Sequence, residues 1–185
     1  MQNMNKALLI IDIQNDYFPG GKMPLVDADK ATENAKQILA HFRDHQLPII
    51  HIQHISTRPS ATFFLPGSEG IEIHDAVKPI SGEIVIVKHY PNSFRETELL
   101  SHLQSENITD LVICGMMTQH CVDSTTRAAK DFGFNCIVIG DACATRDLVL
   151  NGQAILSAQV QLSFLAALNF FFASVHNTQQ WLNEN

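Results

Sequence analysis

Short apolar segments that each end in one charged residue recur along the chain and constrain its fold more than any other feature. The segment from Ala7 to Ile11 is followed by Asp12, and the segment from Ile84 to Val87 is followed by Lys88. Segments that are apolar throughout are typical of parallel strands buried on both faces. Because segments with helical patterns separate them, the sequence predicts an α/β chain with a helix-covered parallel sheet.

The pattern predicts six strands and four longer helices. The strands are expected at residues 6–12, 48–54, 83–88, 110–115, 135–140 and 173–175. The helices are expected at about residues 28–45, 96–106, 118–131 and 150–168. Together they describe a three-layer α/β/α, Rossmann-like sandwich around a six-stranded parallel sheet. No repeat or linker interrupts residues 1–185, so we expect a single domain.

Charge and hydropathy exclude several classes of partner. The net charge of −7 argues against a nucleic-acid or anionic-membrane surface. Residues 148–175 contain no charged side chain, but four amides at positions 153, 159, 161 and 169 interrupt the apolar pattern and argue against a membrane span. We therefore expect this helix to be buried or covered by a partner subunit of a homo-oligomer, a dimer or tetramer. Residues 1–5 lack signal-peptide features, so a cytoplasmic protein is expected.

Cys121 is the strongest candidate for a reactive group. It lies between the apolar segment from Leu111 to Gly115 and a helical pattern, so its thiol is expected at a helix N-terminus, where backbone N–H groups stabilise a thiolate. Carboxyl ends of parallel strands share one edge of a sheet, where ligands bind in α/β folds. Asp12, Lys88 and Cys121 are therefore expected to converge. The other cysteines, Cys114, Cys136 and Cys143, are expected to be structural and not to form disulfides.

Four segments resemble one known family. They are Ile11-Asp-Ile-Gln-Asn-Asp-Tyr-Phe18, the strand end at Lys88, Gly115-Met-Met-Thr-Gln-His-Cys-Val122 and Asp141-Ala-Cys-Ala-Thr145. In this order they resemble the isochorismatase-like cysteine hydrolases, a superfamily that includes nicotinamidases and N-carbamoylsarcosine amidohydrolase. The resemblance extends from Ala7 to Val175, and the family's six-stranded fold agrees with the strands predicted above.

The resemblance implies a role for each candidate residue. Cys121 is expected to be the nucleophile, Asp12 the general acid and base, and Lys88 the cation that orients Asp12 and favours thiolate. The family also implies a cis peptide between Met116 and Met117, and an oxyanion hole made by the backbone N–H groups of Met117 and Cys121. No cofactor is expected.

A metal is not expected either. Nicotinamidases of this superfamily hold a divalent ion with an Asp and histidines after the second strand, but the Asp-x-His pair is missing here. His51 and His54 are three residues apart, so on a strand they point to opposite faces and cannot both bind one ion. His74 lies far along the chain from both.

Several residues are expected to line a substrate pocket. The longest irregular stretch, residues 56–82, is expected to wall the site, because loops of this length in compact domains are usually functional. The pocket candidates are His54, Arg58, Phe18, Phe63 and Phe64. The two polar residues are equally compatible with a solvated loop, and the three aromatic residues with ordinary core packing.

Three classes of function remain open. The first is a cysteine hydrolase that acts on a small linear or cyclic amide through a thioester. The second is isochorismatase itself, which splits a vinyl ether; family members with that activity can lack the cysteine, so the thiol at position 121 argues against it. The third is a non-catalytic small-molecule-binding or thiol-redox protein, which would need neither Asp12 nor Lys88. A dinucleotide-binding protein is disfavoured because no glycine-rich turn follows the first strand.

Overall fold

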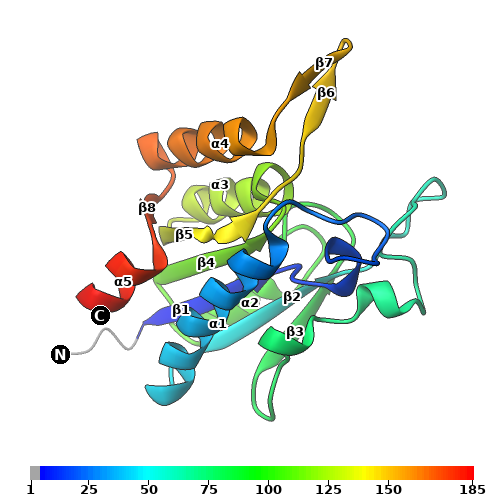
Figure 1. Ribbon diagram of the computed structural model, residues 1–185. Coiled ribbons are helices and arrows are strands. Elements are labelled where there is room, and N and C mark those ends of the chain that lie inside the picture. Colours follow the sequence, from blue (N-terminus) through cyan, green and yellow to red (C-terminus); the bar gives the residue numbers. More distant parts are fainter. Residues whose placement is uncertain (1–4) are drawn as a thin grey trace.

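A six-stranded parallel sheet forms the centre of the molecule (Figure 1). The computed structural model describes residues 5–185, and its main sheet has the order β3-β2-β1-β4-β5-β8. The strands are β1 (Lys6–Ile11), β2 (Ile49–His54), β3 (Ile84–Lys88), β4 (Asp110–Met116), β5 (Asn135–Ala144) and β8 (Ser174–His176). Every neighbouring pair is parallel. The predicted six-stranded parallel sheet is confirmed.

Helices cover both faces of this sheet. α1 (Ala28–Asp44) and α5 (Thr178–Glu184) lie on one face, while α2 (Leu99–Ser105), α3 (Asp123–Asp131) and α4 (Ser157–Phe171) lie on the other. The alternation along β1 shows why: Leu8 and Ile10 belong to the core under α1, whereas Leu9 and Ile11 belong to the opposite core. Side chains on both faces of the strand are therefore buried, as its unbroken apolar run predicts.

Four short helical turns lie in the connections. Three are 3₁₀ turns, at Asn15–Tyr17, Glu69–Ile71 and Asp75–Val77. The fourth is a π-helical turn, Thr118–Val122, which continues directly into α3. The helix predicted at 118–131 therefore exists, but its first turn is wound more loosely than an α-helix, and Cys121 lies in that turn.

The helix predicted to begin near residue 150 begins later. Residues before α4 form a hairpin of β6 (Leu148–Leu150) and β7 (Gln153–Ile155), which projects from the body of the molecule in Figure 1. The turn is Asn151-Gly152, and both residues have positive φ, at 52° and 76°. Asn-Gly is the preferred pair for a two-residue hairpin turn, and here that local signal overrides the apolar helical pattern.

Two other differences have local causes. The helix predicted at 96–106 begins only at Leu99, because Glu96 has a positive φ of 57° that no right-handed helix accepts. Helix α5 lies beyond the last predicted element. Its anchor is Trp181, which is fully buried and stacks on Phe42 of α1 with ring centroids 5.6 Å apart.

Within the described part of the chain, no helix has the length and apolar character needed to cross a membrane. α4 has 15 residues and carries no charge, yet only Val160 and Leu168 are buried on it. It is therefore a surface helix with an unusually apolar exterior.

The strand ends that matter for function meet at one edge of the sheet. β1 and β4 are paired so that Ile11 lies beside Gly115, which places Asp12 next to Met116. This close approach depends on the glycine, because a Cβ atom at position 115 would overlap the carbonyl oxygen of Ile11, and the residue has a φ of +133°. β2 and β3 end together at the pair His54 and Lys88.

Candidate active site

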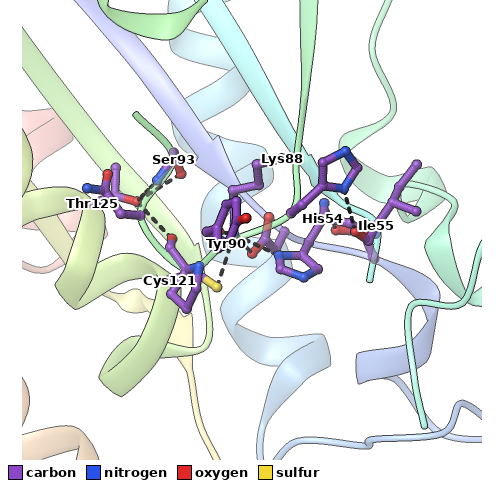
Figure 2. A network of polar contacts seen from close by, with 12 residues as sticks. His54, Ile55, Lys88, Tyr90, Ser93, Cys121 and Thr125 are labelled. Atoms are coloured by element: carbon purple, nitrogen blue, oxygen red, sulfur yellow. Dashed lines mark hydrogen bonds and ion pairs between the residues drawn. The ribbon is translucent and has the colours of Figure 1, made fainter. Parts of the chain in front are cut away.

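The centre of the site is the ammonium group of Lys88. This side chain is fully buried and its Nζ atom lies 2.8 Å from Oδ2 of Asp12 and 3.1 Å from Sγ of Cys121. The same atom is 3.1 Å from Nδ1 of His54 and donates to the carbonyl of Tyr90 at 3.0 Å, contacts that Figure 2 shows from close by. The three residues predicted to converge therefore do so around one cation.

Asp12 is held at the end of β1 in a demanding conformation. Its φ is 52°, in the left-handed region that Asp tolerates better than most residues, and its side chain is completely buried. Oδ2 forms the ion pair with Lys88, and apart from that ion pair neither carboxylate oxygen has a hydrogen-bond partner within the described residues 5–185. Oδ1 is thus available to accept a proton.

Cys121 lies in the π-helical turn, and the half-buried side-chain amide of Gln161 fixes that turn against β5. Thr118 donates to the side-chain oxygen of Gln161 at 2.6 Å, and the amide nitrogen of Gln161 donates to the carbonyls of Gly140 and Cys143 at 2.9 and 3.1 Å. The bond between Met116 and Met117 just before this turn is cis. The position of the thiol is therefore fixed by the protein body rather than by a free loop.

The thiol is protonated at neutral pH. Burial raises the pKa of Cys121, and the Asp12 carboxylate raises it further, while Lys88 lowers it. Lys88 acts in the direction expected from the sequence, but burial and Asp12 outweigh it. The proton must therefore leave Sγ during the reaction, which fits the expected role of Asp12 as a base.

His54 completes the cluster. The side-chain amide of Gln14 brackets its backbone, accepting from the His54 N–H at 2.7 Å and donating to its carbonyl at 2.9 Å. Burial lowers the pKa of His54 to about 4, with Asp12 opposing that shift and Lys88 adding to it. The ring is therefore neutral at physiological pH, and its Nδ1 accepts from the ammonium.

Metal ligands could be drawn from this same cluster, but a cation already lies among them. Ligand atoms of Asp12, His54 and Cys121 all lie within 4.8 Å of one another. The Lys88 ammonium contacts all three residues, so it supplies at this point the positive charge that an ion would bring. A metal bound to these atoms would have to displace or deprotonate Lys88.

The other histidines considered as ligands lie elsewhere. Nε2 of His51 is 2.9 Å from Oε2 of Glu83, which also binds Arg43. His74 stacks on Phe18 with ring centroids 3.9 Å apart. The structure therefore does not bring His51 or His74 to His54.

A pocket of about 570 Å³ opens above Cys121. Four of the five predicted pocket residues, His54, Arg58, Phe63 and Phe64, line it. The complete lining is Tyr17, Met23, His54, Thr57, Arg58, Pro59, Phe63, Phe64, His89, Tyr90, Pro91, Met117, Gln119, His120, Cys121, Arg146 and Leu148. Phe18 is absent from this lining and lies in a separate depression beside His74, so its prediction as a pocket residue is wrong.

Tyr17, for which no role was predicted, lines the pocket in place of Phe18 because residues 15–17 form a 3₁₀ turn. That turn brings the Tyr17 ring to 4.7 Å from the Phe64 ring, while Phe18 faces away toward the loop at His74. The sequence pattern around Asp12 contains both aromatic residues but does not reveal which of them the turn directs to the pocket.

Asp16 fixes the wall of the pocket. Its buried carboxylate accepts from the backbone N–H of Phe64 at 2.6 Å and from that of Lys22 at 3.1 Å. Phe64 has a positive φ of 55°, so this bond holds a conformation that the residue would not adopt freely. Gly70 allows the close packing, because a Cβ there would overlap the Asp16 carboxylate.

Sequence reasoning missed Arg146 and His120 as pocket residues. Arg146 follows the carboxyl end of β5, so the rule that placed Asp12 and Lys88 also pointed to it. His120 directly precedes Cys121 in the π-helical turn. No sequence rule distinguishes that turn from an α-helix, in which position 120 would point elsewhere.

Comparisons with known proteins show the family to which the chain belongs. The family model for the isochorismatase domain matches residues 6–167. The isochorismatase family protein YddQ of Bacillus subtilis is 48% identical over 97% of this chain and 99% of its own length. The solved structure of an isochorismatase-family hydrolase homologue from Oleispira antarctica superimposes with a TM-score of 0.94 at 45% identity, covering 99% of this chain and 98% of its own. A nicotinamidase of Acinetobacter baylyi is 27% identical over 80% of this chain and 85% of its own length.

The six-stranded parallel sheet between two helix layers is the fold of the isochorismatase-family structure that this chain superimposes on. The chain belongs to the isochorismatase family.

The depressed pKa of His54 makes stability pH-dependent. Because the folded pKa of about 4 lies below the ordinary value of 6.5, the unfolded chain binds this proton first. The contribution of neutral His54 to the free energy of unfolding is therefore full above pH 6.5. It decreases as the pH falls from 6.5 through 4, by about 3 kcal/mol at most. We expect urea midpoints to fall over this range, and to fall less steeply in His54→Gln.

His89→Gln is the matched control, since His89 is an exposed histidine of the same pocket. Equal pH slopes for wild type and His54→Gln, measured by urea unfolding at pH 7, 5.5 and 4, would contradict the assignment.

Proposed function

We propose that the protein is a cysteine-dependent hydrolase of a small-molecule amide, with Cys121 as nucleophile, Asp12 as general acid and base, and Lys88 as the cation that links them. The observation that carries this proposal is the position of the Lys88 ammonium, 2.8 Å from the carboxylate and 3.1 Å from the thiol, next to a pocket of about 570 Å³. A binding protein has no need for a buried ion pair beside a thiol.

The first half-reaction transfers an acyl group to sulfur. As Sγ of Cys121 attacks the substrate carbonyl, Asp12 takes the thiol proton, and the C–O π electrons move to oxygen. In this proposal the backbone N–H groups of Met117 and Cys121, two residues of the pocket lining, stabilise that oxyanion. The tetrahedral intermediate then expels its amine, which takes the proton back from Asp12, and a thioester remains.

The second half-reaction restores the enzyme. Asp12 removes a proton from a water molecule as the water attacks the thioester, and the carbon–sulfur bond then breaks. The sulfur leaves with the proton that Asp12 holds, and the carboxylic acid departs. Lys88 stays beside both reacting side chains through these steps and orients the Asp12 carboxylate toward the thiol.

Amide hydrolysis is favoured over vinyl-ether hydrolysis by the thiol itself. Sγ of Cys121 is buried among the charged groups and lines the pocket, an arrangement that a mechanism without a nucleophile does not require. The similarity to a nicotinamidase, an amidase by name, points the same way. A test of isochorismate for pyruvate release distinguishes amide hydrolysis from vinyl-ether hydrolysis.

Cys121→Ala should abolish hydrolysis while the protein remains folded. Loss of the nucleophile is expected to lower turnover by about 10⁴-fold or more. Ammonia release over a panel of small amides measures this, with circular dichroism to check the fold. Cys114→Ala is the matched control, because Cys114 is fully buried outside the pocket and its loss should lower stability rather than turnover.

Wild-type enzyme quenched in acid should carry the acyl group on the peptide that contains Cys121, and hydroxylamine should remove it. An adduct on Cys143, or activity retained in Cys121→Ala, would show that the thiol is assigned wrongly.

Lys88→Met should be severely impaired and should regain part of its activity at higher pH. Lys88 is the group that lowers the pKa of the Cys121 thiol, so its removal raises that pKa further. The pH–rate profile of kcat/KM checks this, with Lys22→Met, an exposed-loop lysine outside the pocket, as the control. An unchanged pH profile in Lys88→Met would rule out the electrostatic role.

We also propose that a second copy of the chain covers α4 and the β6–β7 hairpin. Leu162 and Phe170 on α4 are 72% and 90% exposed, and Val149 and Leu150 on the hairpin are similarly exposed. A two-stranded hairpin is marginally stable alone, and an apolar exterior of this kind marks an interaction surface. A symmetric dimer would pair these uncharged faces without charge repulsion.

Light scattering after size-exclusion chromatography should give a mass of two chains or more for wild type. The double variant Leu162→Glu with Phe170→Glu should give the mass of one chain, and Lys36→Glu on α1 should leave the assembly intact. A monomeric wild type at micromolar concentration would contradict the proposal.

A further inference from the structure

Two of the chain's five arginines have no carboxylate partner. Three form ion pairs: Arg43 with Glu83 at 2.7 Å, Arg95 with Glu96 at 3.6 Å, and Arg127 with Asp123 at 2.9 Å. Arg58 and Arg146 have no carboxylate within 4.0 Å among residues 5–185. Both line the pocket that contains Cys121. The unpaired guanidinium groups are therefore concentrated at the proposed active site.

The pocket lining contains no carboxylate to balance them. No Asp or Glu occurs among its residues, although the whole chain carries a net charge of −7. Asp12 lies beneath the pocket and is paired with Lys88. The protein as a whole is acidic, but the pocket beside Cys121 is lined by two arginines and no acidic side chain.

The two guanidinium groups act on the same part of the pocket. Arg58 comes from the loop after β2 and Arg146 from the segment after β5, yet both lie close enough to His120 to help burial lower its pKa. Arg146 also contacts the thioether of Met23, a partner that restrains the guanidinium without neutralising it. Two segments far apart in the sequence therefore each contribute one arginine to the same pocket.

We infer that the substrate is an anionic amide, whose carboxylate is bound by Arg58 and Arg146 while its amide carbonyl lies against Cys121. This inference rests on the proposed amide hydrolysis and specifies its substrate class. The planar guanidinium presents paired N–H donors that match a carboxylate, which makes arginine the residue suited to this recognition. Phe63 and Phe64 line the same pocket and add apolar surface, which suits a short carbon chain.

The overall reaction is then balanced without any further reagent. A dicarboxylic acid monoamide and water give the dicarboxylate and ammonium. The scissile C–N bond is broken through the thioester, and the carboxylate bound at the arginines is unchanged throughout.

Matched substrates isolate the charge. Malonamate, succinamate and glutaramate are compared with malonamide, succinamide and glutaramide, which replace the carboxylate by a neutral amide. At least one monoamide should be hydrolysed with a kcat/KM about tenfold or more above that of its diamide.

Arg58→Gln and Arg146→Gln should each raise KM for that monoamide by about tenfold while kcat changes little. The reason is that the contact between arginine and carboxylate is the same in the ground and transition states. Arg127→Gln, whose guanidinium is paired with Asp123 outside the pocket, should behave as wild type.

Binding to Cys121→Ala keeps this test independent of catalysis. Calorimetric titration should show a monoamide binding more tightly than its diamide, and that preference should disappear with Arg58→Gln or Arg146→Gln in the same background. If no amide is hydrolysed but this preference is seen, the amidase proposal fails and anion recognition stands. If amides are hydrolysed but neither kinetics nor binding favours the anion in any pair, the carboxylate inference is overturned. The absence of both hydrolysis and binding overturns both.

Discussion

The buried ammonium of Lys88 is the interaction on which the site depends. An ammonium ion removed from water costs several kcal/mol unless its charge and its N–H donors are satisfied. Here Asp12, Cys121, His54 and the Tyr90 carbonyl satisfy them, and they come from four different segments. The parallel pairing of β2 with β3 sets His54 beside Lys88, and the close approach of β1 to β4 sets Asp12 beside the turn that carries Cys121. The register of the parallel strands therefore determines the geometry of the cluster around Lys88.

Burial determines the protonation states of the Cys121 thiol and the His54 imidazole before substrate binds. Both groups are neutral at physiological pH, because desolvation disfavours a thiolate at Cys121 and an imidazolium at His54. A neutral thiol is a poor nucleophile, so the proposed chemistry couples its deprotonation to attack on the substrate. The Asp12 oxygen without a hydrogen-bond partner suits this coupling, and ammonium contacts on both partners limit the charge separation as the proton moves.

The sequence predicted what depends on strand ends and missed what depends on turns. The convergence of Asp12, Lys88 and Cys121 could be predicted because buried parallel strands have a recognisable apolar sequence pattern. The carboxyl ends of such strands share one edge of the sheet. Residues 150–155 of the β6–β7 hairpin fall within a predicted helix because their apolar pattern outweighs the Asn151-Gly152 turn signal. The choice between Tyr17 and Phe18 depends on one 3₁₀ turn, and the Asp16 bond that holds Phe64 joins segments 48 residues apart. Contacts over such separations are decided by packing, which periodicity does not encode.

The division of charge in the pocket explains why a neutral reaction centre and a cationic pocket lining are compatible. Asp12 and Lys88 cancel, and Cys121 and His54 carry no charge at rest, so the reaction centre contributes almost no net field to the cavity. The arginines of that lining then provide the net charge that an incoming molecule meets, against the background of an acidic chain. A carboxylate held there stays away from Asp12, whose own negative charge would repel it. In the proposed enzyme, recognition and bond cleavage are therefore assigned to separate groups: Arg58 and Arg146 select the anion, and the ion pair below acts on a neutral amide.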